Sequence, residues 1–266
     1  MRVSSARLVA VGLLGVLAIP AITSADVILF QNNFEAPTGI VIPSGCCGDA
    51  SQQQVNALYG TSFQQTFTVE TLAINGPQNV YDDPSGIGGN YALGMLSAAQ
   101  DDLLSLTFNT TGLPFINLGW DIAAVGIDQP SGLPSTPTFL DFQNPSTFRV
   151  TLYNTPGGVF NINNLGLFTA LDAETVVGEL PPAGGLTFDW SHHVIGLSTA
   201  GATDGNVTLL IDLTVGGYAA FDNIVIAAAE REGEIPTAVP EPATLLLFGG
   251  GLAAGALKRR RSGSHR

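Results

Sequence analysis

Apolar and polar residues alternate with a period of two along most of the chain. Phe148, Val150 and Leu152 share one face of their segment, and the stretch 207–215 alternates in the same way. Such alternation predicts half-buried strands, because successive side chains of a strand point to opposite faces of a sheet. Strands are predicted over residues 27–34, 63–69, 91–96, 104–109, 115–122, 147–153, 193–197, 207–215 and 218–226.

Clusters of turn-forming residues, such as those at 82–86 and 181–185, separate the predicted strands. No long window between them has a helical stripe, and 171–180 is the least clear segment. Residues 26–228 are therefore predicted to form an all-β, antiparallel β-sandwich of the jelly-roll kind. The alternation ends at residue 229, and the acidic stretch 229–239 is predicted to be a linker.

The N-terminus, residues 1–25, has the features of a secretory signal peptide. Arg2 and Arg7 precede an apolar run of fifteen residues, and small residues precede Asp26. At about 1.5 Å per residue this run spans roughly 22 Å, which is shorter than the hydrocarbon core of a bilayer. The alternative, an N-terminal core helix, would show a polar face. We expect the mature chain to begin near Asp26.

The C-terminus has four parts in order. They are Pro240, Glu241 and Pro242, an uncharged run at 243–257, a basic cluster at 258–261 and a tail at 262–266. This order resembles the PEP-CTERM sorting signal, with its Pro-Glu-Pro box, short hydrophobic helix and arginine cluster. The resemblance implies that an exosortase of a Gram-negative bacterium recognises the box and removes the tail, after transient anchoring in the inner membrane. A plain single-pass anchor is the alternative.

The charge of the chain is concentrated between its two ends. All 22 acidic residues lie between Asp26 and Glu241, and the basic residues of that stretch are Arg149 and Arg231. Nucleic acid is excluded as a partner, because its binding rests on Lys and Arg that neutralise phosphates. An acidic, lysine-poor exterior suits an exported protein surrounded by salt and divalent cations.

An acidic residue follows the first predicted strand, and another lies within the last one. Asp222 alternates with Ala220 and Ile224, and Glu35 follows the first strand. The two segments resemble those of galactose-binding-like, carbohydrate-binding jelly rolls. The resemblance implies a structural Ca²⁺ held by Glu35 and Asp222, with Asn33 as a further ligand. Without a cation, Asp222 would need hydrogen bonds from neighbouring turn amides, since burial of a bare carboxylate is costly.

Three further groups of residues could have a chemical role: a cysteine pair, a serine with two histidines, and several aromatic residues. Cys46 and Cys47 are adjacent and could form a vicinal disulfide or pair between molecules, but they do not have the spacing of a zinc site. Asp189, Ser191, His192 and His193 suggest a hydrolase, although a G-x-S-x-G motif is absent. The alternative is a set of surface polar residues beside a buried Trp190. The aromatic residues that could form a sugar-stacking platform, or simply pack in the core or at its rim, are Tyr81, Trp120, Tyr153, Trp190 and Tyr218.

These features together predict an exported, non-enzymatic protein of the cell surface or the exopolysaccharide matrix. Its sandwich would bind carbohydrate, with exopolysaccharide as the expected partner. The alternative is an enzyme that acts on exopolysaccharide, as a glycoside hydrolase or a lyase. An enzyme would need a pocket with convergent carboxylates, whereas a binding module needs only a groove or a flat aromatic face.

Overall fold

The computed structural model describes residues 26–35, 49–50, 55–66, 69–74, 81–98, 102–126, 144–180 and 187–236. Several predicted features lie outside the described residues. They are the signal peptide, Cys46 and Cys47, the box Pro240, Glu241 and Pro242, the hydrophobic run 243–257 and the basic cluster 258–261.

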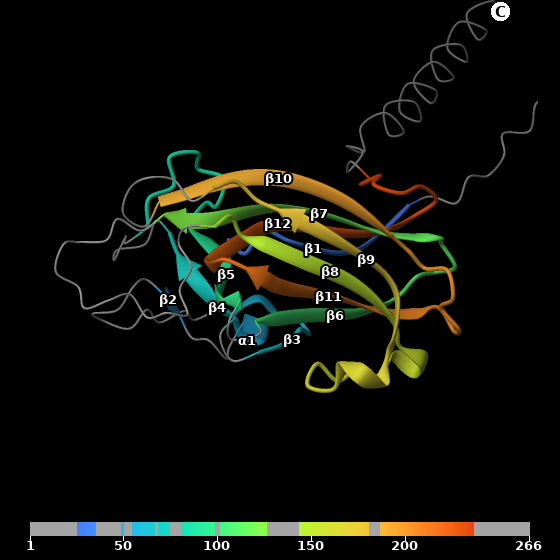
Figure 1. The fold of residues 1–266 in the computed structure, drawn as a ribbon. Helices are drawn as coiled ribbons and strands as arrows, with labels where there is room; N and C mark the ends of the chain where they lie inside the picture. Colours follow the sequence, from blue (N-terminus) through green and yellow to red (C-terminus); the bar gives the residue numbers. More distant parts are fainter. Residues whose placement is uncertain are drawn as a thin grey trace, which may run out of the picture.

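The described chain forms two antiparallel sheets that pack face to face (Figure 1). One sheet contains seven strands: β1 (Val27–Asn32), β2 (Asp49–Ala50), β4 (Val69–Ala73), β5 (Tyr91–Ser97), β7 (Phe115–Gly126), β10 (Thr187–Ser198) and β12 (Gly217–Ala229). Their order is β10-β7-β12-β5-β4-β2, with β1 also paired to β12.

The other sheet contains five strands: β3 (Gln64–Gln65), β6 (Leu103–Asn109), β8 (Thr147–Asn154), β9 (Thr169–Val177) and β11 (Asn206–Val215). Their order is β3-β6-β11-β8-β9. The helical elements are short: α1 (Val55–Tyr59), η2 (Pro156–Gly158) and η3 (Leu165–Leu167). Within the described part of the chain, no helix has the length and hydropathy of a membrane span.

The predicted antiparallel sandwich is confirmed, with three local differences. The strand expected over 63–69 is divided, because the chain leaves the five-stranded sheet after β3 and joins the seven-stranded sheet as β4. Strands β2 and β9 were not predicted. Strand β10 begins at Thr187, six residues before the predicted start at His193.

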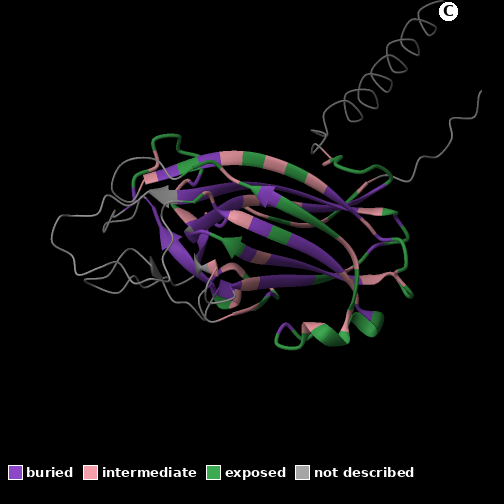
Figure 2. Cartoon of the chain, in the orientation of Figure 1, coloured by how far each residue is buried: buried purple, intermediate pink, exposed green. Residues whose placement is uncertain are grey.

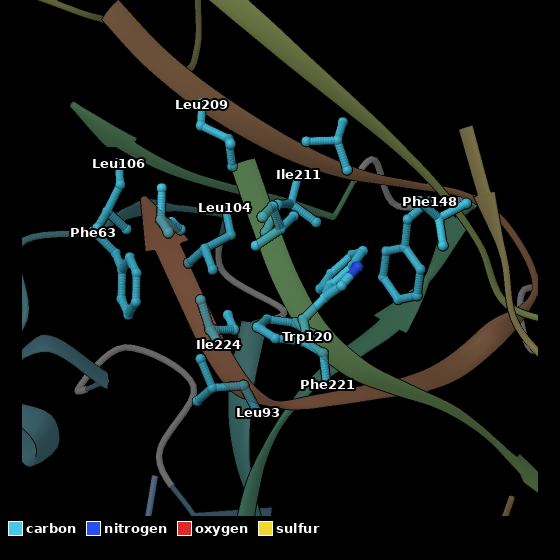
Figure 3. Close-up of a cluster of buried hydrophobic side chains, with 14 of the residues drawn as sticks. Phe63, Leu93, Leu104, Leu106, Trp120, Phe148, Leu209, Ile211, Phe221 and Ile224 are labelled. Atoms are coloured by element: carbon cyan, nitrogen blue, oxygen red, sulfur yellow. The ribbon is translucent and has the colours of Figure 1, made fainter. Parts of the chain in front are cut away.

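The core lies between the two sheets and is centred on Trp120 (Figure 3). The indole ring of Trp120 is fully buried, and its centroid lies 5.0 Å from that of Phe148 and 6.0 Å from that of Phe221. Phe148 comes from the five-stranded sheet and Phe221 from the seven-stranded sheet, so these three rings join the two layers. The predicted inward residues Phe148, Val150 and Leu152 are all buried here.

The seven-stranded sheet is also covered on part of its outer face. A second apolar cluster packs there, and it contains Leu72, Ile74, Tyr81, Ala92, Ala123, Phe188, Trp190 and Ala220. Gly88 fits closely against it, because a Cβ at this position would lie 2.5 Å from the Trp190 ring. Figure 2 shows the result: the middle strands are buried along most of their length, and exposed residues gather in the connecting loops.

Candidate functional site

Asp222 lies on the outer face of the seven-stranded sheet, directly before a β-bulge in β12. Before the bulge β12 pairs with β5, and beyond it β12 pairs with β1. The register with β7 shifts between Asp222 and Val225, and Asn223 has a left-handed φ of 50°. Asp222 therefore shares the outer face with Ala220 and lies directly opposite Asp121 of β7. Two carboxylates thus face each other across neighbouring strands.

The carboxyl group of Asp222 is buried in an unfavourable electrostatic environment. The residue is 1% exposed, and its Oδ1 accepts a hydrogen bond of 2.6 Å from the Asn223 N–H. Burial is the main cause that raises the pKa of Asp222 to about 8. The negative charges of Glu35, Asp121 and Asp83 contribute to this rise, and the hydrogen bond from the Asn223 amide opposes it. Asp222 shares its face with Ala220, as the alternation predicts, but the bulge turns Ile224 to the opposite face, into the core between the sheets.

Glu35 fastens the loop that covers this region. One carboxylate oxygen, Oε1, accepts the N–H of Asn90 at 2.7 Å and that of Tyr91 at 3.3 Å, and Oε2 accepts the Asn90 side-chain amide at 2.7 Å. Gly89 has a φ of 54°, and a Cβ there would collide with the Glu35 carboxylate. Asn33 lies in the preceding turn, where its side-chain oxygen accepts the Glu35 N–H at 3.4 Å.

The negative charge of Glu35 acts on Asp222 and contributes to its raised pKa, but the two carboxyl groups have different hydrogen-bond partners. Both sets of partners include backbone amides. Within the described part of the chain, no three His, Cys, Asp or Glu side chains form a group that could hold a metal ion. A cation bound here would have to take carbonyl or amide oxygens as its other ligands, as Ca²⁺ commonly does.

Asp121 is a member of the site that sequence reasoning missed. It is 8% exposed; its Oδ1 lies 2.7 Å from His192 Nδ1, and its Oδ2 accepts the Asn223 side-chain amide at 2.8 Å. The signal in the sequence is the single acidic residue of the strand that contains Trp120, in which Asn117 is the other polar residue. Its partners come from β10 and β12, which are distant in sequence.

The residues that suggested a hydrolase do not converge on one site, because they lie on opposite faces of β10. Ser191 Oγ lies 2.9 Å from His193 Nε2, but Asp121 pairs with His192. Because successive residues of a strand alternate, His192 and His193 point to opposite faces. Burial and the neighbouring His192 lower the pKa of His193. The carboxylate and the serine therefore act on different imidazole rings.

The aromatic side chains do not form an exposed platform in the described part of the chain. Trp120 and Tyr81 are at most 1% exposed, and Trp190 is 8% exposed. Tyr153 is half-buried and packs against Phe160, with ring centroids 5.7 Å apart. The side chain of Tyr218 lies outside the description. The core interpretation holds for Trp120, Trp190 and Tyr81.

A shallow groove of about 380 Å³ lies between β9, β10 and the segment that follows β12. Glu174 of β9 and Glu232 line it, together with Val194, Ile195 and two glycines. Neither a serine nor a histidine is among its lining residues. The groove is therefore separate from the Ser191 and His193 pair.

Comparison with known proteins identifies the C-terminus. Residues 238–261 match the PEP-CTERM protein-sorting motif. This match includes the predicted box and basic cluster, and it implies an exported protein that is processed by an exosortase. No curated protein is significantly similar to the chain.

Several solved structures are similar to the sandwich at low identity. The K2 cleaved adhesin domain of Lys-gingipain is 15% identical, with a TM-score of 0.41, over 76% of this chain and 97% of that chain. The K3 domain of Lys-gingipain from Porphyromonas gingivalis is 14% identical, with a TM-score of 0.37, over 76% of this chain and 99% of that chain. The C-terminal family 22 carbohydrate-binding module from Clostridium thermocellum is 16% identical, with a TM-score of 0.35, over 80% and 99%.

Proposed function

We propose that this protein is a non-enzymatic component of the cell surface or the exopolysaccharide matrix, and that its sandwich binds polysaccharide. The observation that carries the proposal is the sorting motif at 238–261, which directly follows a folded β-sandwich. The stretch from Asp26 to Glu241 is strongly acidic, with 22 acidic and two basic residues. Such a surface remains soluble in a hydrated matrix that is rich in counter-ions.

We place the binding face on the outside of the five-stranded sheet. Along β8, Arg149, Thr151 and Tyr153 alternate with residues of the core; Arg149 is exposed, Tyr153 is half-buried and Thr151 is buried. Arg149 lies opposite Asp212 of β11, so a fixed cation and a fixed anion are neighbours on this face. Sugar hydroxyl groups both accept and donate hydrogen bonds, and a guanidinium beside a carboxylate offers the complementary pair.

A folded-over loop bounds this face at one end. Phe160 and Ile162 of the loop 156–168 pack on Leu210 of β11, and Tyr153 packs against the same cluster. Gln64 fastens the loop through bonds to the Phe160 carbonyl at 2.8 Å and the Ile162 N–H at 3.1 Å. The loop is therefore held in place on the outer face of this sheet.

Binding to isolated exopolysaccharide tests the proposal. We expect the wild-type protein to be retarded in gels that contain exopolysaccharide from a producing bacterium, and Arg149→Ala to lose about tenfold in affinity, or about 1.4 kcal/mol. His192→Gln, on the other sheet, is the matched control and should bind normally. The proposal would be contradicted if the polysaccharide did not retard the wild-type protein. It would also be contradicted if Arg149→Ala bound the polysaccharide as tightly as wild type.

We also propose a structural Ca²⁺ that joins the first and last strands through Glu35 and Asp222. The donor set is oxygen-rich, as a hard cation requires. The buried carboxyl of Asp222 lies in the field of three further carboxylates, and a divalent cation would relieve that repulsion. Glu35 would then hold both the ion and the loop at 89–91.

A further inference from the structure

The segment that follows β12 is bound to the sandwich, although the sequence predicts a linker there. Asn117 of β7 is fully buried and makes three hydrogen bonds to the backbone of this segment. Its side-chain amide donates to the carbonyls of Arg231 at 2.7 Å and Glu234 at 2.8 Å. Its Oδ1 accepts the N–H of Gly233 at 2.9 Å. One side chain thus holds a whole turn, and we call residues 230–236 the clasp.

Two glycines of the sheet make the space in which the clasp lies. A Cβ at Gly196 of β10 would lie 2.5 Å from Glu232 Cγ and 2.7 Å from Gly233 N. A Cβ at Gly119 of β7 would lie 3.2 Å from Ile235. Because β7 and β10 are neighbours, the two glycines and Asn117 form one continuous seat. A side chain at Gly196 would displace the clasp backbone.

The clasp also contacts the residue directly before β1. The Glu230 N–H donates to the Asp26 carboxylate at 3.2 Å, and Val27 pairs with Ala228. The start of β1 and the clasp therefore lie at the same end of the sandwich (Figure 1). Both of the chain's export signals are joined to this end.

The clasp leaves little free chain before the sorting box. Only residues 237–239 separate Pro236 from Pro240. At about 3.3–3.6 Å per residue, the distance from Pro236 to Pro240 is at most about 14 Å. An enzyme that binds an extended peptide needs backbone on both sides of the bond that it cleaves. The folded domain would stand directly beside that enzyme.

We propose that the clasp is a brake on sorting: it must open before the processing enzyme can take up the chain upstream of the Pro-Glu-Pro box. The clasp forms only when β7, β10 and β12 are assembled, so the brake belongs to the folded sandwich. Opening the clasp frees seven further residues. This inference is independent of glycan binding, because it uses the opposite sheet and the sorting motif alone.

The test uses the full chain expressed in a bacterium that has an exosortase. Three variants are compared with wild type: Asn117→Ala, Gly196→Ala, and an insertion of a flexible Gly/Ser segment between Pro236 and Thr237. Gly166→Ala is the matched control, because a Cβ there meets nothing within 4 Å. The fraction of processed protein is followed over time by intact mass. We expect all three variants to be processed several-fold faster than wild type and the control.

Trypsin reports the state of the clasp independently. Between Asp26 and Leu257 its sites are Arg149 and Arg231, and Arg149 is paired on both sides by β9 and β11. Cleavage after Arg231 should be slow in wild type and in the insertion variant, and fast in Asn117→Ala and Gly196→Ala. If the insertion variant is processed no faster than wild type, the brake is refuted, whether or not the substituted variants fold. Rapid cleavage of folded wild type at Arg231 would also refute it.

Discussion

The buried carboxyl of Asp222 predicts an unusual dependence of stability on pH and calcium. In the folded protein without a cation its pKa is about 8, and in the unfolded chain it returns to the ordinary value of 3.8. Between these values the unfolded state binds fewer protons than the folded state, so the free energy of unfolding falls as pH rises. From pH 5 to pH 8 the loss reaches up to about 4 kcal/mol, at about 1.36 kcal/mol per pH unit.

Calcium should reverse this loss if the proposed site exists. An ion that binds only the folded state adds about 2.7 kcal/mol when its concentration is a hundredfold above Kd. For a domain of this size that raises Tm by about 5–10 °C. Magnesium should substitute poorly, because it demands tighter octahedral geometry and loses its water reluctantly.

Thermal unfolding followed by circular dichroism at pH 5 and pH 8, in chelator and in calcium, separates these effects. Asp222→Asn should remove both the loss at high pH and the response to calcium. Asp189→Asn, an exposed acid on β10, is the matched control and should behave as wild type. If the Tm of the wild-type protein were the same in chelator and in calcium, the proposed Ca²⁺ site would be excluded. If Asp222→Asn kept the wild-type decline between pH 5 and pH 8, the argument from burial would be wrong.

Three further predictions concern processing and packing. The extracellular protein should begin at Asp26 and lack residues 243–266 by intact mass; a retained tail would indicate a plain anchor. Ile211→Asp places a charge at a position only 2% exposed in the core, so the strand signal in circular dichroism should be lost at 25 °C, and a native spectrum would contradict the inward assignment. Gly89→Ala should cost about 1–3 kcal/mol more than Gly86→Ala in urea unfolding, because both glycines have positive φ but only a Cβ at Gly89 meets the Glu35 carboxylate.

The alternation predicted the strands whose two faces differ. In β8 the inward residues are Phe148, Val150 and Leu152, and the outward ones are polar, so the pattern was visible without any knowledge of neighbours. Strand β9 was missed because it is an edge strand, where Glu174 lies opposite Val150 but remains exposed. An inward position at the rim of a sheet does not have to be apolar, so the period of two disappears.

The candidate site was predictable only in part, for a related reason. Asp222 was a candidate because it interrupts an apolar strand, and in the structure it is 1% exposed. The hydrogen-bond partners of Asn117 are backbone groups more than 110 residues away. Every residue type has these backbone groups, so the amino-acid sequence does not indicate the contact. The acidic composition of 230–236 favoured a linker, but the hydrogen bonds that hold this segment do not depend on its side chains.

The position of β12 in the seven-stranded sheet sets the order of folding during export. This strand pairs with β1, β5 and β7. Each of these three strands is exported before β12, and the edge that pairs with β12 stays without hydrogen-bond partners until β12 arrives. Pairs such as Val27 with Ala228 close very long loops, and such contacts form slowly. Until residue 229 has emerged, the sheet therefore stays incomplete, and its unpaired strand edges are exposed to proteolysis and aggregation.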